Sequence, residues 1–313
     1  MSHVSLTIIV ISYNTREMTL ECLRSVFRET CQETFELIVL DNASADGSAE
    51  AIAEEFGDKV RLIASSENLG FAGGNNQAAG VALGDYILML NPDTVVLDGA
   101  VDRLVEFARQ RPDAGIWGGR TLFGDGTLNR ASCWSRQTLW SLICQALGFS
   151  SLFRRSTFFN AEAMGGWDRE GIRFVDIVSG CFLLIRHDLW SRLNGFRPEF
   201  FMYGEEADLC LRARNFGARP MVSSAATIIH YGGASETIRA DKLVRLLSAK
   251  MRLVQYHFPV FTKWLGCWLL SLWPVSRYWA QTMLGRIVRQ PLADKSAVWR
   301  EVVRRRNEWY SLL

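Results

Sequence analysis

Two aspartates follow directly on apolar runs in the first hundred residues. Asp41 comes after the run 35–40 (FELIVL), and a carboxylate there can accept hydrogen bonds from a nucleobase or a ribose. Asp93 comes shortly after the run 85–90 (DYILML), and a carboxylate at that place can hold a divalent cation between two phosphates. Each aspartate also has a purely structural reading, because Asp caps helices and the sequence Asn-Pro-Asp is common in turns. Both readings stay open at this point.

Three further carboxylates, Glu205, Glu206 and Asp208, open a segment with helical spacing. The helix dipole favours acidic residues in a first turn, which is a sufficient structural reason for them. A carboxyl group with an unperturbed pKa of about 4 is ionised at neutral pH, so one of the three could take a proton from a hydroxyl. His230 ends the apolar run 226–230, where it has either a structural role or contacts a metal, and imidazole suits Mn²⁺ better than Mg²⁺.

A glycine-rich segment, ENLGFAGGNN at 67–76, leads into an expected helix over 73–83. Its glycines could bring backbone amides close to a phosphate at the helix N-terminus, although a plain turn explains them equally well. The dinucleotide fingerprint G-x-G-x-x-G is absent, which argues against a nicotinamide-dependent dehydrogenase.

Apolar runs alternate with helical patterns in front of these polar residues. The expected strands are 6–12, 35–40, 60–64 and 85–90, and the expected helices are 16–28, 48–56 and 73–83. Strands that are apolar throughout and separated by helices indicate a parallel sheet with both faces covered. The sequence therefore predicts an α/β, Rossmann-like domain whose ligands bind beyond the carboxyl ends of the strands.

The composition is that of a globular protein. The chain has 313 residues, of which 49% are hydrophobic and 22% charged, and its net charge of +2 argues against a nucleic-acid binder that depends on overall basicity. Seven scattered Cys without a CxxC pair indicate reduced thiols. Met1 leads almost directly into the first strand-like run, so we expect no secretory signal and a cytoplasmic location.

The last part of the chain has a different character. From Glu236 onward there are 14 Lys and Arg against 5 Asp and Glu, and six of the eleven Trp lie after residue 260. We expect a boundary here, with one domain over 1–235 and a helical, basic and aromatic region over 236–313. Its longest uncharged stretch, 264–276, has 13 residues. That is short of the about 20 residues needed to span a bilayer.

An apolar face with Trp, followed by basic residues, suits the surface of an anionic membrane. The basic residues in question are Arg286, Arg289, Lys295, Arg300, Arg304, Arg305 and Arg306. The alternative is a helical hairpin packed on the body of the protein or on another subunit.

Six polar blocks occur in a specific order. They are SYN at 12–14, DNASADGS at 41–48, NLGFAGGNN at 68–76, NPDT at 91–94, GFRPEFFMYGEEADLCLR at 195–212 and IIHYGGAS at 228–235. Together they resemble the inverting family-2 glycosyltransferases of the GT-A fold, and most of all their bacterial rhamnosyltransferase-type branch. The resemblance covers about residues 5–235.

The resemblance implies a nucleotide-sugar site. Asp41 would contact the nucleobase, and Ser12 and Asn14 would line the same pocket. The residues expected around the rest of the nucleotide are Asn68, Gly70, Gly73, Gly74 and Asn75.

The resemblance also implies a metal and a base. The Asp-x-Asp metal motif of the family corresponds to Asn91-Pro92-Asp93 here, so Asp93 would hold Mg²⁺ or Mn²⁺ without a second carboxylate at this motif, with His230 as a further metal contact. The base motif corresponds to Glu205-Glu206. Glu206 stands where the family usually has aspartate, and Glu205 and Asp208 are the other candidates for the base.

The implied reaction is inverting, metal-assisted transfer of a sugar to a saccharide acceptor in cell-surface polysaccharide synthesis. The favoured donor is dTDP-rhamnose and the acceptor is expected to be lipid-linked, with the chain peripheral on the inner face of the cytoplasmic membrane and able to form a homo-oligomer. Another nucleotide sugar, such as one of galactofuranose or glucose, is the first alternative. A nucleotidyltransferase is a second, but its basic glycine-rich loop is missing. A non-catalytic binder of nucleotide sugars or carbohydrates is the third.

Overall fold

The computed structural model of the chain describes residues 3–232, 239–287 and 292–310. The chain divides into two compact units. The first unit consists of residues 1–134 and 168–235, and the second consists of residues 135–167 and 236–313. Segment 135–167 thus interrupts the first unit in sequence. All seven Cys are free thiols, and only Cys31 is exposed.

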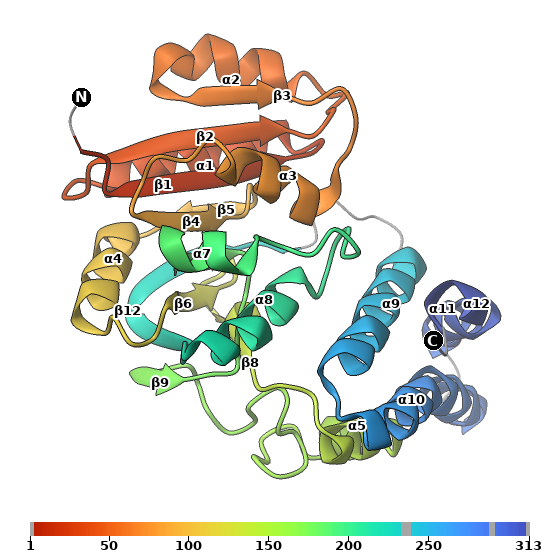
Figure 1. Ribbon diagram of the computed structural model, residues 1–313. Helices are drawn as coiled ribbons and strands as arrows, with labels where there is room; N and C mark the ends of the chain where they lie inside the picture. The colour runs from red at the N-terminus through yellow and green to blue at the C-terminus, as the bar shows by residue number, and fades with distance from the viewer. Residues whose placement is uncertain (1–2, 233–238, 288–291, 311–313) are drawn as a thin grey trace. The chain divides into compact units, whose positions relative to one another are not determined.

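A twisted sheet forms the centre of the first unit (Figure 1). Its strand order is β3-β2-β1-β4-β11-β6-β12-β5, and two short strands pair at its side. The strands are β1 (Leu6–Ser12), β2 (Phe35–Asp41), β3 (Arg61–Ala64), β4 (Tyr86–Leu90), β5 (Thr94–Val96), β6 (Ile116–Leu122), β7 (Leu128–Asn129), β9 (Ile172–Phe174), β11 (Phe182–Arg186) and β12 (Met221–His230). A separate pair joins β8 (Cys133–Trp134) to β10 (Ile177–Val178).

Strands β3, β2, β1 and β4 are parallel, whereas β11 runs antiparallel to both β4 and β6. Residues throughout β1 are buried, as expected for a strand with helices on both sides. The predicted α/β fold with a mostly parallel sheet is confirmed.

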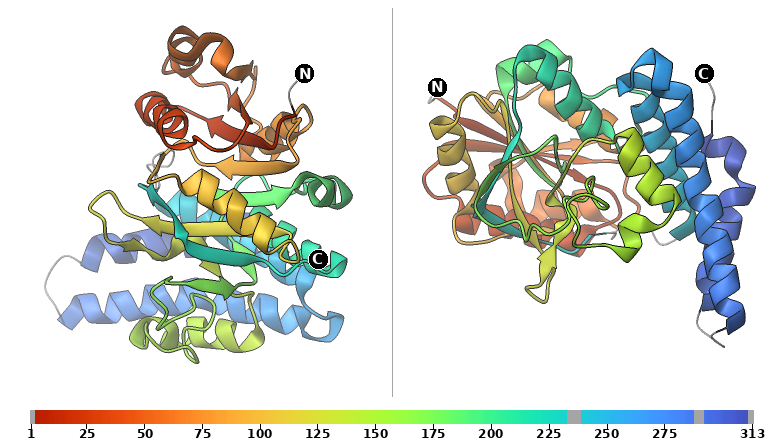
Figure 2. Two further views of the ribbon diagram at one scale, coloured as in Figure 1. Left: turned by 90° about the vertical axis from the view of Figure 1, so that its left-hand side faces the viewer. Right: turned by 90° about the horizontal axis from the view of Figure 1, so that it is seen from below.

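Helices cover both faces of this sheet (Figures 1 and 2). They are α1 (Arg16–Glu29), α2 (Ser48–Phe56), α3 (Gly70–Ala79), α4 (Ala100–Gln110), α7 (His187–Leu193) and α8 (Glu205–Ala213). Apolar residues of α1, α2 and α4 share one core with Leu6, Ile8 and Val10 of β1. Helix α3 packs on the opposite face, because its Gly74 lies against Ile11.

The start of α3 differs from the sequence prediction by three residues. The helix begins at Gly70, whose φ of +71° suits glycine, and it ends at Ala79 rather than Leu83. Strand β12 also begins earlier than expected, at Met221, and its register against β6 shifts between Ser223 and Thr227. An irregularity of this kind masks the alternation that marks a strand in a sequence.

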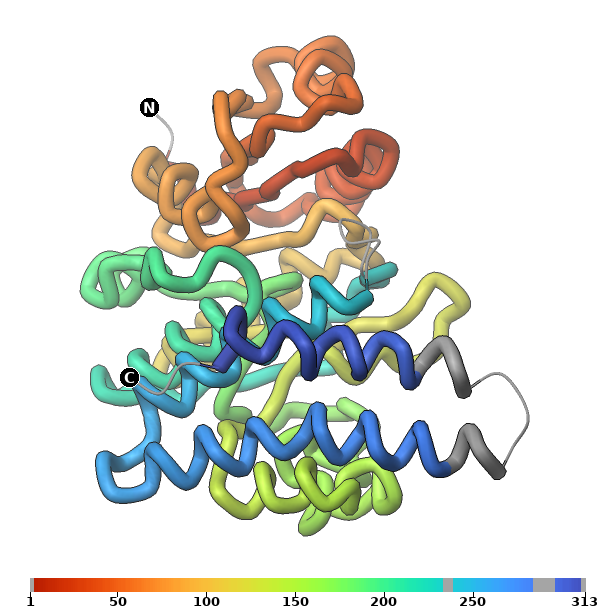
Figure 3. The backbone as a smooth tube through the Cα atoms, turned by 90° about the vertical axis from the view of Figure 1, so that its right-hand side faces the viewer, coloured from red at the N-terminus to blue at the C-terminus, as the bar shows by residue number. Residues whose placement is uncertain are grey.

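The second unit is helical. Its helices are α5 (Leu139–Ala146), α6 (Phe149–Leu152), α9 (Arg239–His257), α10 (Val260–Ile287), α11 (Leu292–Arg304) and α12 (Arg306–Trp309). Helix α10 packs against α5, α9 and α11, and Figure 3 shows α10 and α11 side by side. Leu142, Leu247, Leu270 and Val302 belong to the core of this unit. The predicted C-terminal helical region is confirmed, and it includes the helices of segment 135–167.

No helix among the described residues is long and apolar enough to cross a membrane. Of the basic residues that the sequence singled out, Arg289 lies outside the described residues, and the side chains of Arg286 and Lys295 are not described either.

Candidate functional site

The carboxyl ends of β1 and β2 meet, because Ser12 and Asp41 are register partners in these parallel strands. Ser12 is fully buried, and its Oγ lies 3.1 Å from Oγ1 of Thr19 on α1. Asp41 is also buried. One of its carboxylate oxygens accepts the backbone N–H of Ser44 at 3.0 Å, and the other has no hydrogen-bond partner among the described residues. One acceptor oxygen of Asp41 is therefore not used by any described residue.

Asn14 fixes the turn that follows Asp41. Its φ of +51° is in the left-handed region, its N–H donates to Oγ of Ser44, and its Oδ1 accepts the N–H of Ala45 at 2.8 Å. Asp46 accepts hydrogen bonds from Ser48 and from the N–H of Arg16, and so holds the beginning of two helices. The turn is therefore built before any ligand arrives.

Asn42 connects β2 to the start of α3. Its Nδ2 donates to Oδ1 of Asn68 at 3.0 Å and to the carbonyl of Gly70 at 3.2 Å, and its Oδ1 accepts the N–H of Leu69 at 2.8 Å. Asn68 also accepts the N–H of Gly70. Sequence reasoning missed Asn42 as a site residue. Its one signal was an amide directly after the strand-end Asp41.

The glycines of α3 allow close packing. A Cβ on Gly70 would lie 2.3 Å from the carbonyl oxygen of Phe201, which accepts the N–H of Phe71. A Cβ on Gly74 would lie 3.2 Å from Ile11, and a Cβ on Gly73 would lie 3.1 Å from Cβ of Leu69. These glycines bring the start of α3 close to the sheet and to the segment before α8.

Asn75 lies on the buried side of the same helix. Its Nδ2 donates to the carbonyl of Phe71 at 2.9 Å. Its Oδ1 is buried and has no partner among the described residues, so Asn75 retains one acceptor.

Asp93 and His230 come together because β5 pairs antiparallel with β12. The Oδ1 of Asp93 lies 3.4 Å from Nε2 of His230, and Nδ2 of Asn91 lies 3.3 Å from the same nitrogen. The other oxygen of Asp93 accepts the N–H of Gly232 at 2.9 Å. Burial alone would raise the pKa of Asp93, but the contacts with His230 hold it below its ordinary value. Burial lowers the pKa of His230, whereas Cys181 and Asp93 beside it raise that pKa to about 10.

Oδ1 of Asp93 and Nε2 of His230 face each other, so the two side chains could supply two ligands to one ion once Nε2 has lost its proton. Neighbouring ligands of an octahedral Mg²⁺ lie about 3 Å apart, close to the separation of Oδ1 and Nε2. Asn91 Oδ1 and His230 Nδ1 are buried without partners in the described part of the chain. That part contains no group of three or more His, Cys, Asp or Glu side chains that could hold a metal. Phosphate oxygens and water would have to complete the shell.

The three carboxylates at the start of α8 have different surroundings. Asp208 is fully buried and pairs with Nε of Arg212 at 2.6 Å and with Nε of Arg197 at 3.5 Å. Glu205 and Glu206 each have an oxygen without a partner among the described residues. Burial raises the pKa of both, and the charge of Glu206 raises that of Glu205 further. Glu206 is the more exposed of the two.

Gly180 lies between the acidic end of α8 and the start of α3. A Cβ on Gly180 would be 3.8 Å from Cβ of Glu206 and 3.1 Å from the ring of Phe71. The next residue, Cys181, accepts the N–H of Asn91 through its carbonyl at 3.2 Å. The structure thus brings the start of α3, Glu206 and the Asn91 turn together around residues 180–181. Neither Gly180 nor Phe71 is among the residues that the sequence predicts for the site, because only the fold brings them to this place.

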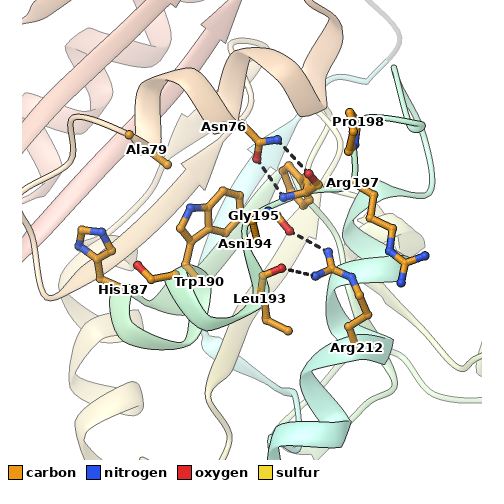
Figure 4. Close-up of a pocket in the computed structure, with 13 residues that line it drawn as sticks. Asn76, Ala79, His187, Trp190, Leu193, Asn194, Gly195, Arg197, Pro198 and Arg212 are labelled. Atoms are coloured by element: carbon orange, nitrogen blue, oxygen red, sulfur yellow. Dashed lines mark hydrogen bonds between the residues drawn. The ribbon is translucent and has the colours of Figure 1, made fainter.

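A separate hollow of about 820 Å³ lies between α3 and α7 (Figure 4). Trp190, Asn194 and Arg197 are among the residues that line it, and none of the residues predicted for the nucleotide, metal or base does so. Asn76 spans the hollow's edge, because its side chain both donates to the carbonyl of Phe196 and accepts its N–H, each at 2.9 Å.

Solved structures share this fold. A mannosyltransferase from Pyrobaculum calidifontis, solved in complex with GDP-Man and Mn²⁺, matches with a TM-score of 0.60 and 16% identity over 99% of this chain and 88% of that one. TarS 1–349 of S. aureus in complex with UDP matches with a TM-score of 0.51 and 16% identity, over 93% of this chain and 77% of that one. Both support the GT-A fold.

The relatives identified by sequence match this chain over only part of their length. An N-acetylglucosaminyl-diphospho-decaprenol L-rhamnosyltransferase of Mycobacterium tuberculosis (strain CDC 1551 / Oshkosh) is 25% identical over 213 residues, 62% of this chain and 66% of that protein. The O-antigen biosynthesis protein RfbC of Myxococcus xanthus is 27% identical over 227 residues, 70% of this chain but 16% of that protein. The chain therefore matches slightly less than two thirds of the first relative and a small part of the second.

The family described as glycosyl transferase family 2 matches residues 7–189, which is more than half of the chain. The order of strands, the strand-end polar residues and the similar structures agree with that match. The chain belongs to glycosyl transferase family 2.

Proposed function

We propose that this enzyme transfers L-rhamnose from dTDP-rhamnose to a saccharide acceptor during the synthesis of a cell-surface polysaccharide. The names of the two relatives support the sugar and the role in polysaccharide synthesis. The observation that carries the catalytic part is the position of Glu206 beside Gly180 and Phe71, at the start of α3. A transfer of galactofuranose or glucose from another nucleotide is the alternative within the same chemistry.

The donor binds at the ends of β1, β2 and α3. The free oxygen of Asp41 accepts a hydrogen bond from the nucleobase, and Ser12 and Asn14 hold the surrounding turn in place. Asn68 and Asn75, with the glycines of 70–74, form the wall along the rest of the nucleotide. The buried, unpartnered oxygens of Asp41 and Asn75 support this assignment, because such atoms gain most from a ligand donor.

Asp93 and His230 would hold the divalent cation, Mg²⁺ or Mn²⁺. Their separation of 3.4 Å supports the assignment. When bound, the cation offsets the charge that develops on the leaving diphosphate. The N–H of Gly232 and the contacts to Asn91 fix the two side chains in this position without the ion.

Glu206 acts as the general base. Its carboxylate takes the proton of the acceptor hydroxyl while that oxygen bonds to the anomeric carbon, and the nucleoside diphosphate leaves with the electron pair of the broken bond. Configuration at that carbon inverts in this single displacement. Asp208 positions the segment before α8 through Arg197 and Arg212.

The acceptor is lipid-linked, as the name of the Mycobacterium relative says of that enzyme. The chain would then work at the inner face of the cytoplasmic membrane, with residues 1–235 carrying the chemistry and 236–313 attaching it there.

The test is a transfer assay with the full chain and Mn²⁺, using dTDP-rhamnose, UDP-galactofuranose and UDP-glucose in parallel. A prenyl-diphosphate-linked N-acetylglucosamine serves as acceptor. Product from dTDP-rhamnose alone, lost in Glu206→Gln, supports the proposal. Product from another donor overturns the choice of rhamnose. If the folded protein binds a donor but gives no product with any of the three, a non-catalytic binder is favoured. The absence of a carboxylate at position 91, which is Asn91, is consistent with that alternative.

A further inference from the structure

One face of α10 is apolar and exposed along almost its whole length. Spacings of three and four residues place the following residues on a single face of the helix: Phe261, Trp264, Trp268, Leu272, Val275, Trp279 and Met283. We call these seven residues the α10 stripe. Its five bulkiest exposed members have exposed fractions between 48% and 89%, and Leu272 and Val275 are half-buried.

The opposite face of α10 already has its core. Cys267, Leu269 and Leu270 pack with residues of α5, α9 and α11, so the helix is apolar on both sides. A helix that is apolar all round is buried on both sides in other proteins. The stripe therefore lacks a covering partner in the described part of the chain, and it is too regular to be a scatter of surface residues.

The charge of the second unit selects the partner. Residues 135–167 and 236–313 contain 17 Lys and Arg but only 6 Asp and Glu, whereas the first unit contains 18 and 27. A cation also lies beside the stripe, because the guanidinium of Arg300 lies 5.9 Å from the ring of Tyr278, the neighbour of Trp279. A strongly basic unit would repel a second copy of itself, and it matches an anionic lipid surface.

Tryptophan further favours a membrane. Three of the seven stripe residues are Trp, whose ring is apolar and whose N–H needs a hydrogen bond, and such side chains concentrate at the level of lipid headgroups. A stripe along one helix places all three at one depth if the helix lies flat on the surface. Helix α10 contains Pro274 and carries Lys263 and Arg277, which suits a flat position rather than a spanning one.

We infer that the α10 stripe is the surface by which this chain docks onto an anionic membrane, with α10 parallel to the plane of the bilayer. The inference deepens the proposed function, since it rests on the membrane location proposed there and names the residues that provide it. Arg300 attracts the lipid phosphates, and the stripe residues enter the headgroup region.

The test is co-sedimentation of the full-length protein with vesicles of phosphatidylcholine containing about 30% phosphatidylglycerol. The variant Trp264→Gln/Trp268→Gln/Trp279→Gln should bind at least about 100-fold more weakly, from the loss of three large apolar side chains. Leu83→Gln, an exposed apolar residue of the first unit, is the matched control and should bind like the wild type. Pure phosphatidylcholine vesicles should bind the wild type more weakly.

A second variant guards against loss of folding. Phe261→Ser/Met283→Ser changes exposed residues at the two ends of the stripe and should also weaken vesicle binding, with an unchanged circular dichroism spectrum. Wild-type binding that survives both variants overturns the inference. The inference is also overturned if the wild-type protein does not bind vesicles but forms a dimer, and the Trp variant is a monomer. In that case the stripe joins two copies of the chain. Transfer to a short soluble acceptor should be the same in all these variants, which separates this test from that of the transferase activity.

Discussion

Asn42 and Asn68 share a hydrogen bond of 3.0 Å that ties the end of β2 to the start of α3. The same Asn42 side chain holds the backbone of Leu69 and Gly70. One buried amide therefore fixes the distance between the turn that follows Asp41 and the glycine-rich segment. Asn42→Ala should lower the free energy of unfolding by about 2–3 kcal/mol, because it leaves several buried polar groups without a hydrogen-bond partner. Urea unfolding measures this.

The control for Asn42 is Gln77→Ala, on the exposed side of α3, which should leave stability within about 0.5 kcal/mol of the wild type. Asn42→Ala should also weaken donor binding. Equal stability of the two variants would contradict the connecting role of Asn42.

Gly70 combines a positive φ with a close contact, and substitution separates the two effects. Ala at Gly126, which has φ of +80° and open space, should cost about 1 kcal/mol from the backbone alone. Ala at Gly70 must also displace Phe201, so it should cost about 3 kcal/mol. The comparison of Gly70→Ala with Gly126→Ala by thermal unfolding checks this. Similar losses would mean that segment 197–204 does not press on α3.

Glu206→Gln removes the proposed base with little change in shape. Turnover should fall at least about 100-fold, while the affinity for the donor stays the same. Since burial raises the pKa of Glu206, the wild-type rate should decline as the pH falls through that raised pKa, where the carboxylate becomes protonated. Rates from about pH 5 to pH 9 give the profile. Asp208→Asn serves as a comparison, and a larger loss there than in Glu206→Gln would move the base away from Glu206.

Glu205 links stability to pH. Its pKa is raised in the folded protein, chiefly by burial and then by the charge of Glu206, so the folded state holds its proton more tightly than the unfolded state. The associated stability is complete below the unfolded pKa and is lost as the pH rises through the folded one. Glu205→Gln should therefore raise the melting temperature more at about pH 8 than at about pH 4. A gain that is the same at both values would show that Glu205 is not buried as a carboxylate.

Asp93→Asn tests the metal pair. The substitution keeps the size and removes the charge, so Mn²⁺ should bind at least about tenfold more weakly. The readout is the rise in melting temperature that Mn²⁺ and dTDP-rhamnose produce together, since ligands of the folded state stabilise it. Asp125→Asn, in an exposed turn, is the control. An unchanged Mn²⁺ effect in Asp93→Asn would exclude Asp93 as a ligand.

Much of the first unit is predictable because its strands are apolar along their whole length. The predicted strands 6–12, 35–40 and 85–90 appear as β1, β2 and β4, with polar residues where each ends. The contacts of Asn42 and Gly180 could not be predicted, because they join segments far apart in the chain. A local sequence pattern contains no information on a contact between residues that lie far apart in the chain.

The second unit shows a different limit. The sequence places the helical region at 236–313, but residues 135–167 also form helices, α5 and α6, and cluster with the C-terminal helices. The spacing of apolar residues predicts that α10 has a buried face. It does not tell which of the two apolar faces packs on protein. Only the packing of α5, α9 and α11 against one face shows that the α10 stripe is the other.

Different strands carry the two ends of the proposed donor site. Asp41 ends β2, whereas Asp93 lies between β4 and β5, and His230 ends β12. In the proposed site, recognition of the nucleobase and handling of the leaving diphosphate would therefore depend on different hydrogen-bond networks. Substitutions in the turn at 41–48 would then change the preferred nucleotide and leave the groups around Asp93 and Glu206 as they are. Related enzymes would be able to change the nucleotide of their donor by changing one short loop.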